Sequence, residues 1–546
     1  MRDPATGNVI VINGEIYNHR ALREQLGRDV PWRGMSDTET LLQAYARWGR
    51  GMLERVKGMF AFAIYDHARG EIFLARDRLG IKPLYYKSDL DSIRFASEMR
   101  VLLGGDEAVT PESLSAYLQW GASPEECLLY PDIHVLPAGH AMTIGARGER
   151  KMWRYWPSRP AFISPAGDAV GEVRRLVEQA VDEHLLSDVP LATFLSGGID
   201  SSIVTALAAQ KLAGKLQTFS VAFAVEQFDE SPIAREVAER YDTEHHRLEL
   251  SEEEVIHSVT EAVEKMDLPS VDAINTYIVS RAVAAQGVKV ALSGLGGDEL
   301  FGGYASFRDV PRLKLIAKSP RFIRRVAGAA VGLGERLADL PPHAEADELA
   351  RWRRRFFTDR MLQRAGLPNE ASPLERPIAL PDDYAGISWT ELTGYMCRML
   401  LRDADQMSMA VSLELRVPFL DHELVEYVLG LPGAAKRGFP GVKGLLVEAG
   451  RDLLPSSVYL RPKAGFDLPM KTWMLGPLAS FVAEGLRETV ALNLLPERFV
   501  DESRVTFERG QLHWTRLWSI VVLGHFAKRS RKPRSLHEDS ALHSLS

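Results

Sequence analysis

Two glycine-rich loops, each directly after a short apolar run, constrain the fold of this chain more than any other feature. The first, residues 196–202 (Ser-Gly-Gly-Ile-Asp-Ser-Ser), lies between an apolar run at 189–195 and a helical pattern at 199–212. The second, residues 293–304, follows an apolar run at 288–292. Short apolar runs that alternate with helical patterns are typical of buried parallel strands. We therefore predict a doubly wound parallel sheet with both loops at the carboxyl ends of strands.

The sequence between and before these loops extends the alternation. Helical spacing of apolar residues predicts amphipathic helices over 169–186 and 231–240. Apolar runs predict further strands over 217–223 and 246–250. The whole stretch is therefore expected to be an α/β domain.

The first part of the chain has a different pattern. Its strands lie close together with turns between them, as in antiparallel hairpins, at 8–14, 59–65, 71–75, 84–86 and 93–96. Short helices are predicted there over 22–26 and 38–48, the second with Asp37 as its N-cap. This pattern predicts an α+β domain.

The chain has 546 residues, which is too many for a single core, so two or more domains are expected. The segment 157–167 contains three prolines and a glycine and is interpreted as a linker. This places one domain at 1–156, a second at 157–527 and a basic, then polar, disordered tail at 528–546. The arginine-rich stretch 308–383 is interpreted as helical cover over the sheet with a solvated face.

Composition excludes several classes of protein. The formal net charge of −7 argues against a nucleic-acid binder with a basic surface. No uncharged apolar run approaches the roughly 20 residues that span a bilayer, and residues 1–7 lack the apolar core of a secretory signal. The two cysteines, Cys127 and Cys397, exclude a disulfide scaffold and a cysteine-rich zinc site. A cytoplasmic location is predicted.

The first loop has the chemistry of an anion site. Backbone N–H groups and the positive end of a helix would face a bound phosphate, and the serines add donors. Asp200 would repel a bare phosphate, so we predict that it binds Mg²⁺. Asp298 of the second loop is expected to face Asp200 across the same ion. Neither loop is the lysine-containing phosphate loop of kinases and GTPases, and the spacing in the second is not that of a dinucleotide fingerprint.

Together the loops resemble those of asparagine synthetase of the glutamine-hydrolysing type. The first loop is similar to the pyrophosphate loop (SGGxDS) of enzymes that cleave ATP between its α and β phosphates. Further segments resemble family motifs in the same order along nearly the whole chain: 13–18, 36–39, 75–86, 402–410, 414–421 and 461–466. The resemblance implies an Ntn-type (class II) glutamine amidotransferase domain that lacks its first strands, then an ATP-pyrophosphatase (PP-loop) domain.

The resemblance implies two half-reactions that use ATP and Mg²⁺. Glutamine is hydrolysed at the first site, and ammonia passes inside the protein to the second. There a carboxylate, aspartate in the first instance, attacks ATP to give an acyl-adenylate and pyrophosphate, and ammonia captures the acyl group. By carry-over the nucleotide site comprises Leu195, Ser196, Gly197, Gly198, Asp200, Ser201, Val221, Ser293 and Gly294, with Asp200 and Asp298 on the metal. The glutamine site comprises Asn13, Gly14, Glu15 and Asp37.

Three charged residues outside the loops are candidates for the chemistry. Lys463 is expected to stabilise the charge that develops on the α-phosphate, the alternative being a solvated loop lysine. Glu414 is expected to orient a basic group or to accept the proton from attacking ammonia, the alternative being a salt bridge with Arg416 or Arg402. Lys443, placed in a helix, is a weaker phosphate ligand.

The amidotransferase part departs from the family pattern. The family uses an N-terminal cysteine as nucleophile, whereas residue 2 here is Arg2, and Cys127 matches no nucleophile motif. Either the reading frame starts late, at an internal methionine, or the activity is truly lost and free ammonia or another amine is used. We favour the first because the glutamine-site residues are retained. The chain as printed is predicted not to hydrolyse glutamine.

The second loop also departs from the pattern. Many family members have glutamate between its first two glycines, where this chain has Leu295. Aspartate is therefore not established as the acceptor, and two other functions compete with asparagine synthesis. One is a related adenylating enzyme acting on another carboxylate, as in β-lactam synthetases or lasso-peptide cyclases, and the other is a non-catalytic nucleotide-binding protein. Under each of these alternatives the expected ligands are small molecules. Because family members often dimerise, the resemblance suggests a homodimer.

Overall fold

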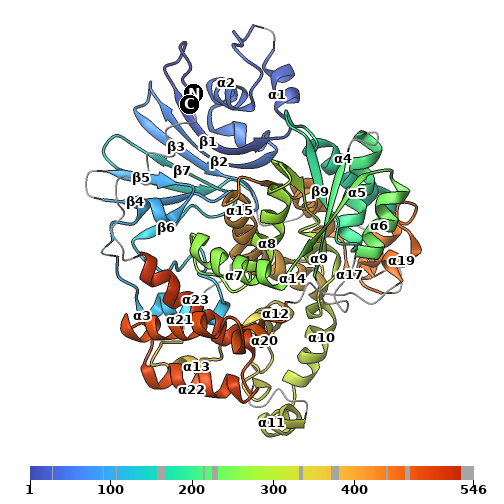
Figure 1. Cartoon of the computed structure of the whole chain (residues 1–546). Helices are drawn as coiled ribbons and strands as arrows, with labels where there is room; N and C mark the ends of the chain where they lie inside the picture. The colour runs from blue at the N-terminus through green and yellow to red at the C-terminus, as the bar shows by residue number, and fades with distance from the viewer. Residues whose placement is uncertain are drawn as a thin grey trace.

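The computed structural model describes residues 1–530 apart from 28, 90–91, 106, 157–166, 213–215, 224–230, 331–335, 370–379, 438–440 and 461–467. The predicted linker and the motif around Lys463 therefore lie almost wholly outside the described residues. Figure 1 shows antiparallel strands from the first third of the chain, in blue, beside a parallel sheet flanked by green helices. No helix of the described residues is long and apolar enough to cross a membrane.

The first region contains two antiparallel sheets. The larger has the order β1 (Val9–Ile16), β2 (Gly58–Asp66), β3 (Glu71–Arg76), β7 (His140–Ile144) and β8 (Arg150–Arg154). The smaller has the order β5 (Ile93–Ala96), β4 (Tyr85–Ser88) and β6 (Ile133–Val135). The predicted hairpins are confirmed, since β2 pairs with β3 and β4 with β5 in antiparallel register. Helical segments in this region are α1 (His19–Leu26), α2 (Asp37–Trp48), η1 (Gly49–Glu54), η2 (Met99–Leu102) and α3 (Pro111–Trp120).

Successive side chains of β2 point to opposite faces of the larger sheet, and this explains how the layers stack. Phe60, Phe62 and Ile64 point to one face and pack against α1 and α2, whereas Ala61 and Ala63 point to the other face and pack against the smaller sheet. The region is thus a helical layer and two sheets, held by a core on each side of the larger sheet.

The predicted N-cap of α2 is corrected by one residue. Ser36 caps the helix, because its side chain accepts a hydrogen bond from the backbone N–H of Glu39. Asp37 is the first helical residue, and its carboxylate accepts a hydrogen bond from the backbone N–H of Ile16 at 3.0 Å. Asp37 therefore ties the start of α2 to the end of β1.

The second region contains the predicted parallel sheet. Its order is β11 (Glu244–Leu250), β10 (Gln217–Phe223), β9 (Leu191–Phe194), β12 (Val290–Leu292) and β13 (Glu414–Arg416). All four neighbouring pairs are parallel. The connecting helices include α4 (Ala169–His184), α5 (Ile199–Leu212), α6 (Ser231–Arg240), α7 (Glu252–Lys265) and α8 (Ala273–Ala284). Apolar side chains of α4, α5 and α6 share one core with the sheet, and those of α8 and α15 share another.

The first of the remaining helices lies within the second glycine loop. In chain order they are α9 (Gly297–Phe301), α10 (Ser306–Ala317), α11 (Arg321–Ala330), α12 (Ala346–Arg354), α13 (Asp359–Arg364), α14 (Asp383–Thr390), the π-helix η5 (Glu391–Leu400), α15 (Leu401–Met409), η6 (Pro418–Leu420), α16 (His422–Gly430), α17 (Gly433–Lys436), α18 (Gly444–Ala449), α19 (Ser456–Tyr459), α20 (Met470–Leu475), α21 (Ala479–Ala491), α22 (Glu497–Glu508) and α23 (Trp514–Ser530). Because α23 continues to Ser530, the first three residues of the predicted disordered tail are helical.

The arginine-rich stretch 308–383 does not cover the sheet as predicted. Helices α10 and α12 pack against each other, α14 and η5, and they share a separate apolar core. In Figure 1 α10 and α11 extend away from the parallel sheet. The helices of this stretch therefore form a separate layer, whose arginines are considered below.

Side chains from both regions form one large core near the carboxyl end. Helix α23 packs against α3 and α7, and the Tyr117 hydroxyl donates to the backbone carbonyl of Ser519 at 2.9 Å. Trp518, which is fully buried, belongs to the same apolar cluster as Tyr117 and Leu118. Figure 1 shows α23 and α21, in red, beside α3. The two regions are thus joined by a shared interior.

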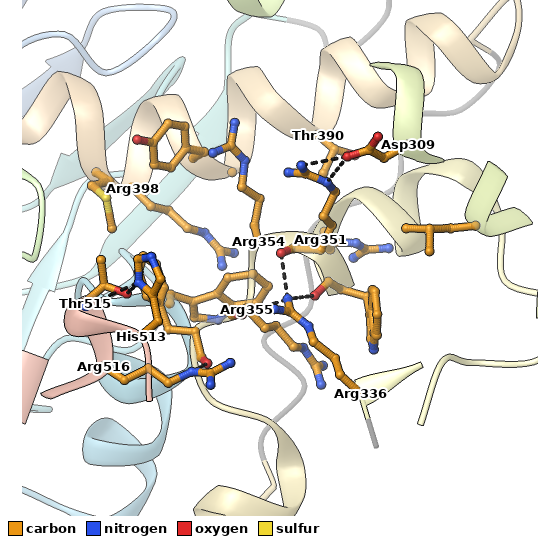
Figure 2. A pocket seen from close by; sticks show the side chains of 18 of the residues that line it. Asp309, Arg336, Arg351, Arg354, Arg355, Thr390, Arg398, His513, Thr515 and Arg516 are labelled. Atoms are coloured by element: carbon orange, nitrogen blue, oxygen red, sulfur yellow. Dashed lines mark hydrogen bonds and ion pairs between the residues drawn. The ribbon is translucent and has the colours of Figure 1, made fainter. Parts of the chain in front are cut away.

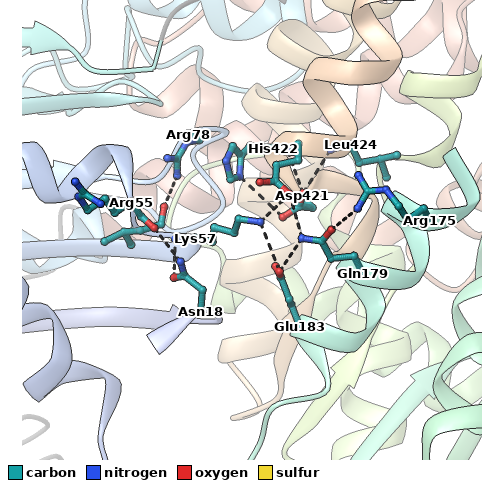
Figure 3. A network of polar contacts seen from close by, with 12 residues as sticks. Asn18, Arg55, Lys57, Arg78, Arg175, Gln179, Glu183, Asp421, His422 and Leu424 are labelled. Carbon is teal, nitrogen blue, oxygen red and sulfur yellow. Dashed lines mark hydrogen bonds and ion pairs between the residues drawn. The ribbon is translucent and has the colours of Figure 1, made fainter. Parts of the chain in front are cut away.

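A polar network joins the regions at a second place (Figure 3). Lys57, after η1, lies 2.7 Å from Glu423 and 3.5 Å from Glu183, both of the second region. Burial alone would lower the pKa of Lys57, but these carboxylates raise it. Lys57 is therefore held charged at the boundary between the regions.

Candidate active site

Both glycine loops lie at the carboxyl edge of the parallel sheet, as predicted. The first follows β9 and the second follows β12, and these two strands are neighbours at the centre of the sheet. From β9 the chain crosses to β10 on one side, and from β11 it returns to β12 on the other. The loops therefore flank the point where the strand order reverses, which is where ligands bind in open α/β sheets.

The first loop is closed by its own serines. The hydroxyl groups of Ser196 and Ser201 lie 3.1 Å apart, and the backbone N–H of Ser196 donates to the Ser201 hydroxyl at 3.3 Å. Gly197 has a φ of 74°, a conformation that side chains disfavour, and α5 begins two residues later. The loop thus leads directly to the amino end of a helix of 14 residues, which favours a bound anion.

Glycines of the second loop allow it to touch the first. A Cβ atom on Gly294 would lie 2.8 Å from the Asp200 Cβ and 2.9 Å from the Ser201 backbone nitrogen. A Cβ atom on Gly297 would overlap the Asp200 carboxylate. No side chain larger than hydrogen fits between the loops, so these glycines set the approach of Asp298 to Asp200.

Lys443 joins the two acids. Its ammonium group forms ion pairs with Asp200 and with Asp298, the second at 2.5 Å. Lys443 lies just before α18 at its N-cap, with a φ of 59°, and not inside a helix as predicted. A Cβ atom on Gly303 would overlap both the Asp298 carboxylate and the Lys443 side chain. Three segments that are far apart in sequence therefore place a cation and two acids at one point.

The electrostatics of this triad are those of a buried site. Burial would lower the pKa of Lys443, but the carboxylates of Asp200 and Asp298 raise it above its ordinary value. Lys443 has only 5% of its side chain exposed. A charged lysine is thus held between the two glycine loops.

Glu299 was not among the predicted site residues, although it follows Asp298 directly. It is fully buried on α9, and burial together with the charge of Asp298 raises its pKa to about 7. The hydroxyl of Tyr304 donates to its carboxylate at 2.6 Å. The sequence did contain a signal for Glu299, because it is the second of two adjacent acids among glycines.

Three predicted nucleotide-site residues also lie at this edge. Leu195 is fully buried, and its backbone N–H donates to the Phe219 carbonyl at 2.8 Å, which fixes the start of the first loop. Val221 lies toward the carboxyl end of β10, and Ser293 directly follows β12. Leu295 packs against two apolar cores.

Of the other two candidates for the chemistry, Glu414 is not brought to the loops. Glu414 begins β13 and pairs with Val290 at the start of β12, so it lies at the amino end of the sheet. Its carboxylate accepts a hydrogen bond from Arg416 at 2.8 Å, which is the ion pair considered as the alternative. Lys463 lies outside the described residues.

The predicted glutamine-site residues come together near the end of β1. Asn13, Gly14 and Glu15 are consecutive on that strand, and Asp37 bonds to the next residue, Ile16. Burial raises the pKa of Glu15 to about 7 although Arg416, 3.6 Å away, opposes the rise. A Cβ atom on Gly14 would overlap the Met59 carbonyl of β2.

Neither cysteine lies on β1 or α2, which carry the predicted glutamine-site residues. Cys397 lies in η5 of the second region, where its thiol donates to the Leu79 carbonyl at 3.2 Å and burial raises its pKa. Cys127 lies in a turn, with its backbone N–H bonded to the Pro124 carbonyl. A reactive thiol needs a lowered pKa, which Cys397 lacks.

The donor set at the loops suits a hard cation. Asp200 and Asp298 offer carboxylate oxygens, which Mg²⁺ prefers. Among the described residues, no group of three or more His, Cys, Asp or Glu side chains gathers to hold a metal. A cation between these two acids would therefore need further oxygens from water or a phosphate-bearing ligand, as is usual for Mg²⁺.

Two family profiles match the chain. Residues 172–528 match the family described as Asparagine synthase, and residues 1–156 match the Glutamine amidotransferase domain.

Individual proteins are similar along most of the chain. Asparagine synthetase (glutamine-hydrolyzing) 1 of Bacillus subtilis (strain 168) is 32% identical over 505 residues, which cover 88% of this chain and 79% of that protein. A putative asparagine synthetase (glutamine-hydrolyzing) of Mycobacterium bovis is 31% identical over 94% of this chain and 83% of its own length. The protein named amidase chyE of Penicillium rubens is 27% identical over 86% of this chain and 78% of its own length.

Proposed function

We propose, from the premise that this chain belongs to the asparagine synthetase family, that its two glycine loops form the site where ATP activates a carboxylate. As a member of this family the chain is a glutamine-dependent carbon–nitrogen ligase. The observation that carries the proposed site is the convergence of Asp200, Asp298 and Lys443 beside the amino end of α5. We assign the second region to the PP-loop class and the first to the Ntn class.

The proposed reaction has two steps. A carboxylate oxygen of the acceptor attacks the α-phosphorus of ATP, the bond to the bridging oxygen breaks, and pyrophosphate leaves. Ammonia then attacks the acyl carbon, the acyl–oxygen bond breaks, AMP leaves, and the nitrogen loses a proton. Ser196, Gly197, Gly198 and Ser201 would hold the pyrophosphate, because their backbone and hydroxyl donors lie at the amino end of a helix.

Lys443 would serve the phosphates in this scheme. In the described structure its ammonium lies between Asp200 and Asp298, and a polyphosphate would be a stronger partner than either acid alone. Mg²⁺, held by Asp200 and Asp298, would neutralise charge on the departing pyrophosphate. We retain Lys463 as a second cation for the α-phosphate and do not retain Glu414 as a base at the loops.

Aspartate is the acceptor that we propose, with another carboxylate as the alternative. Leu295 packs into the apolar interior and offers no polar group at the loop. Recognition of an acceptor must therefore come from other residues. The similarity to an amidase as well as to asparagine synthetases is the observation that keeps the alternative.

The first region is proposed not to hydrolyse glutamine in the chain as printed. Cys397 is bonded to Leu79 with a raised pKa, and Cys127 lies in a turn between α3 and β6, far along the chain from the strand bearing Asn13. Ammonia is then the nitrogen source that this chain would use in isolation. We further propose domain boundaries at 1–156 and 157–527, a cytoplasmic location and a homodimer.

Exchange of labelled pyrophosphate into ATP tests the proposed site. Exchange that requires aspartate is expected, because adenylate formation is reversible before ammonia arrives. Exchange that is silent with aspartate but present with another acid would assign the chain to the alternative. Binding of ATP without exchange for any acid would contradict the proposed activation of a carboxylate.

A further inference from the structure

A pocket of about 910 Å³ lies apart from both glycine loops (Figure 2). Its walls are α10, α12, η5 and the start of α23, and no described residue of the two loops lines it. Eight arginines line this pocket, with Asp309 as its single acid. The chain as a whole has a net charge of −7, so the pocket concentrates positive charge against the overall balance. Six of the eight come from the stretch 308–383, for which the sequence predicts a solvated face, and here they line a pocket instead.

Several of these arginines have acidic partners within or beside the pocket. The ion pairs are Arg353 with Asp309 at 2.8 Å, Arg354 with Glu391 at 2.8 Å, Arg351 with Asp347 at 2.9 Å, Arg355 with Asp359 at 3.0 Å, and Arg398 with Glu126. These pairs neutralise part of the charge and fix the direction of the guanidinium groups.

Arg336 and Arg516 have no such partner. Arg336 donates to the carbonyls of Trp352, Arg353 and Arg355 at 2.8–3.2 Å, and Arg516 donates to the Phe356 carbonyl at 2.6 Å. Among the described residues, no carboxylate forms an ion pair with either. Burial and the neighbouring guanidinium groups lower the pKa of Arg336 to about 10. Two half-buried cations therefore face the pocket with only neutral partners from the protein.

The pocket is also rigidly built. Arg354 lies 3.9 Å from the Tyr395 ring centre, and Arg336 lies 5.0 Å from that of Trp352. Such stacking holds a guanidinium in place while its N–H groups remain available at the edge. One wall is the π-helix η5, a rare conformation that is frequent at functional sites. The arginines are therefore positioned in advance, which reduces the entropy lost on binding.

We propose that this pocket binds a small molecule that carries two or more phosphate groups. Its volume lies within the roughly 300–1,000 Å³ of ligand pockets in proteins. Guanidinium forks match phosphate oxygens in two-point contact, and several forks around one space require a ligand with several negative charges. A nucleotide and a free polyphosphate share this chemistry.

The pocket is connected to the proposed active site through Arg354. Its guanidinium lies 4.6 Å from the Tyr304 ring centre, and the Tyr304 hydroxyl donates to Glu299 beside Asp298. A ligand that pulls on Arg354 would therefore act on the second glycine loop.

Calorimetric titration of the full chain at low ionic strength tests the proposal, with inorganic tripolyphosphate and ADP as probes. The double variant R312Q/R516Q should lose about tenfold or more in affinity for tripolyphosphate, because two charge-assisted contacts are removed. Arg312 is exposed at the pocket, so the single variant R312Q should fold normally and lose about threefold. Binding of ATP at the loops should be unchanged in both. Equal affinity for both probes would indicate that a polyphosphate suffices, and tighter ADP binding would indicate a nucleotide.

The matched control is R509Q, which removes the same charge from an exposed position outside the pocket. It should leave tripolyphosphate affinity unchanged. The proposal is overturned if R312Q and R312Q/R516Q bind tripolyphosphate as tightly as the unaltered chain. An equal loss in R509Q would also overturn it, because it would reduce the effect to net charge.

Discussion

The loop site of the second region and the residues around β1 in the first region are built differently. At the loops, Asp200, Asp298 and Lys443 come from three distant segments, and the lysine neutralises part of the charge of the two acids. Around β1, Asp37 bonds to the neighbouring backbone of Ile16, and Gly14 is required by the close approach of Met59. Asp37 and Gly14 therefore have a role in the fold itself. Their retention therefore does not by itself show that glutamine is hydrolysed, whereas the triad gathers two acids around one buried lysine between the loops.

The largest effect is expected from Asp298→Asn. If the triad serves ATP and Mg²⁺, pyrophosphate exchange should fall by about 100-fold or more, because one of two carboxylates at the cation position loses its charge. The exposed Asp132→Asn should retain full exchange. Normal exchange in the Asp298 variant would contradict a role of the triad in the reaction with ATP.

Lys443→Met removes the positive charge of the triad but keeps a side chain of similar length. Two acids would then face each other without a cation, and the free energy of unfolding should fall by about 4 kcal/mol in denaturant titration. Millimolar Mg²⁺ should restore part of this loss in the variant, because the ion can take the position between the acids. A variant that Mg²⁺ does not stabilise would contradict the proposed metal ligands.

Glu299 and Glu15, one in each region, both have a pKa raised to about 7, but they differ in exposure. The folded pKa of Glu299 exceeds its unfolded value, so the contribution of Glu299 to stability is greatest below pH ~4.5 and is lost as pH rises through 7. Glu299→Gln should therefore stabilise the chain at pH 8 by up to about 3 kcal/mol and have little effect at pH 4.5.

Glu15→Gln should show less than about 1 kcal/mol of the same pH dependence, because 40% of the Glu15 side chain is exposed and solvent screens it. Denaturant titrations of both variants between pH 4.5 and 8 measure the difference. Equal pH dependence in the two would show that burial does not distinguish the sites.

Gly303→Ala tests whether the close approach in the loop site is strict. The added methyl would overlap Asp298 and Lys443, and a loss of about 2 kcal/mol in stability is expected. Gly386→Ala is the control, since its Cβ would meet nothing within 4 Å and it lies inside α14. The control should be neutral or slightly stabilising in thermal unfolding, and a similar loss in both would exclude the steric explanation.

The smallest effect is expected from Cys127→Ser. Glutamate release from glutamine should be undetectable before and after the change, and ammonia-dependent activity should be the same in both. Release of glutamate by the unaltered chain that the variant lacks would make Cys127 a nucleophile and overturn our account of the first region.

Much of this molecule followed from local sequence. The helix predicted at 199–212 and the strand at 217–223 match α5 and β10, because turn residues and apolar periodicity mark them clearly. The meeting of the two loops followed from the rule that parallel strands end at one edge.

Long-range placement was harder to predict. Lys443 is 243 residues from Asp200, and no local pattern indicates their contact. The position of Glu414 at the amino end of β13 was not predictable, because a motif gives residue types but not the end of the strand on which they lie. The arginines of 308–383 gave no periodic signal for a pocket, since their arrangement depends on the packing of α10, α12 and η5.

The shared core around Tyr117 and Trp518 has a consequence for synthesis of the chain on the ribosome. The hydrogen bond from Tyr117 to Ser519 spans 402 residues, so α3 emerges long before α23 can cover it. Until then the apolar face of α3 is exposed, and the first region cannot complete its folding during translation. A fragment cut near residue 157 would retain that exposed face permanently and would be prone to aggregate, although the sequence marks the same position as a natural place to divide the chain.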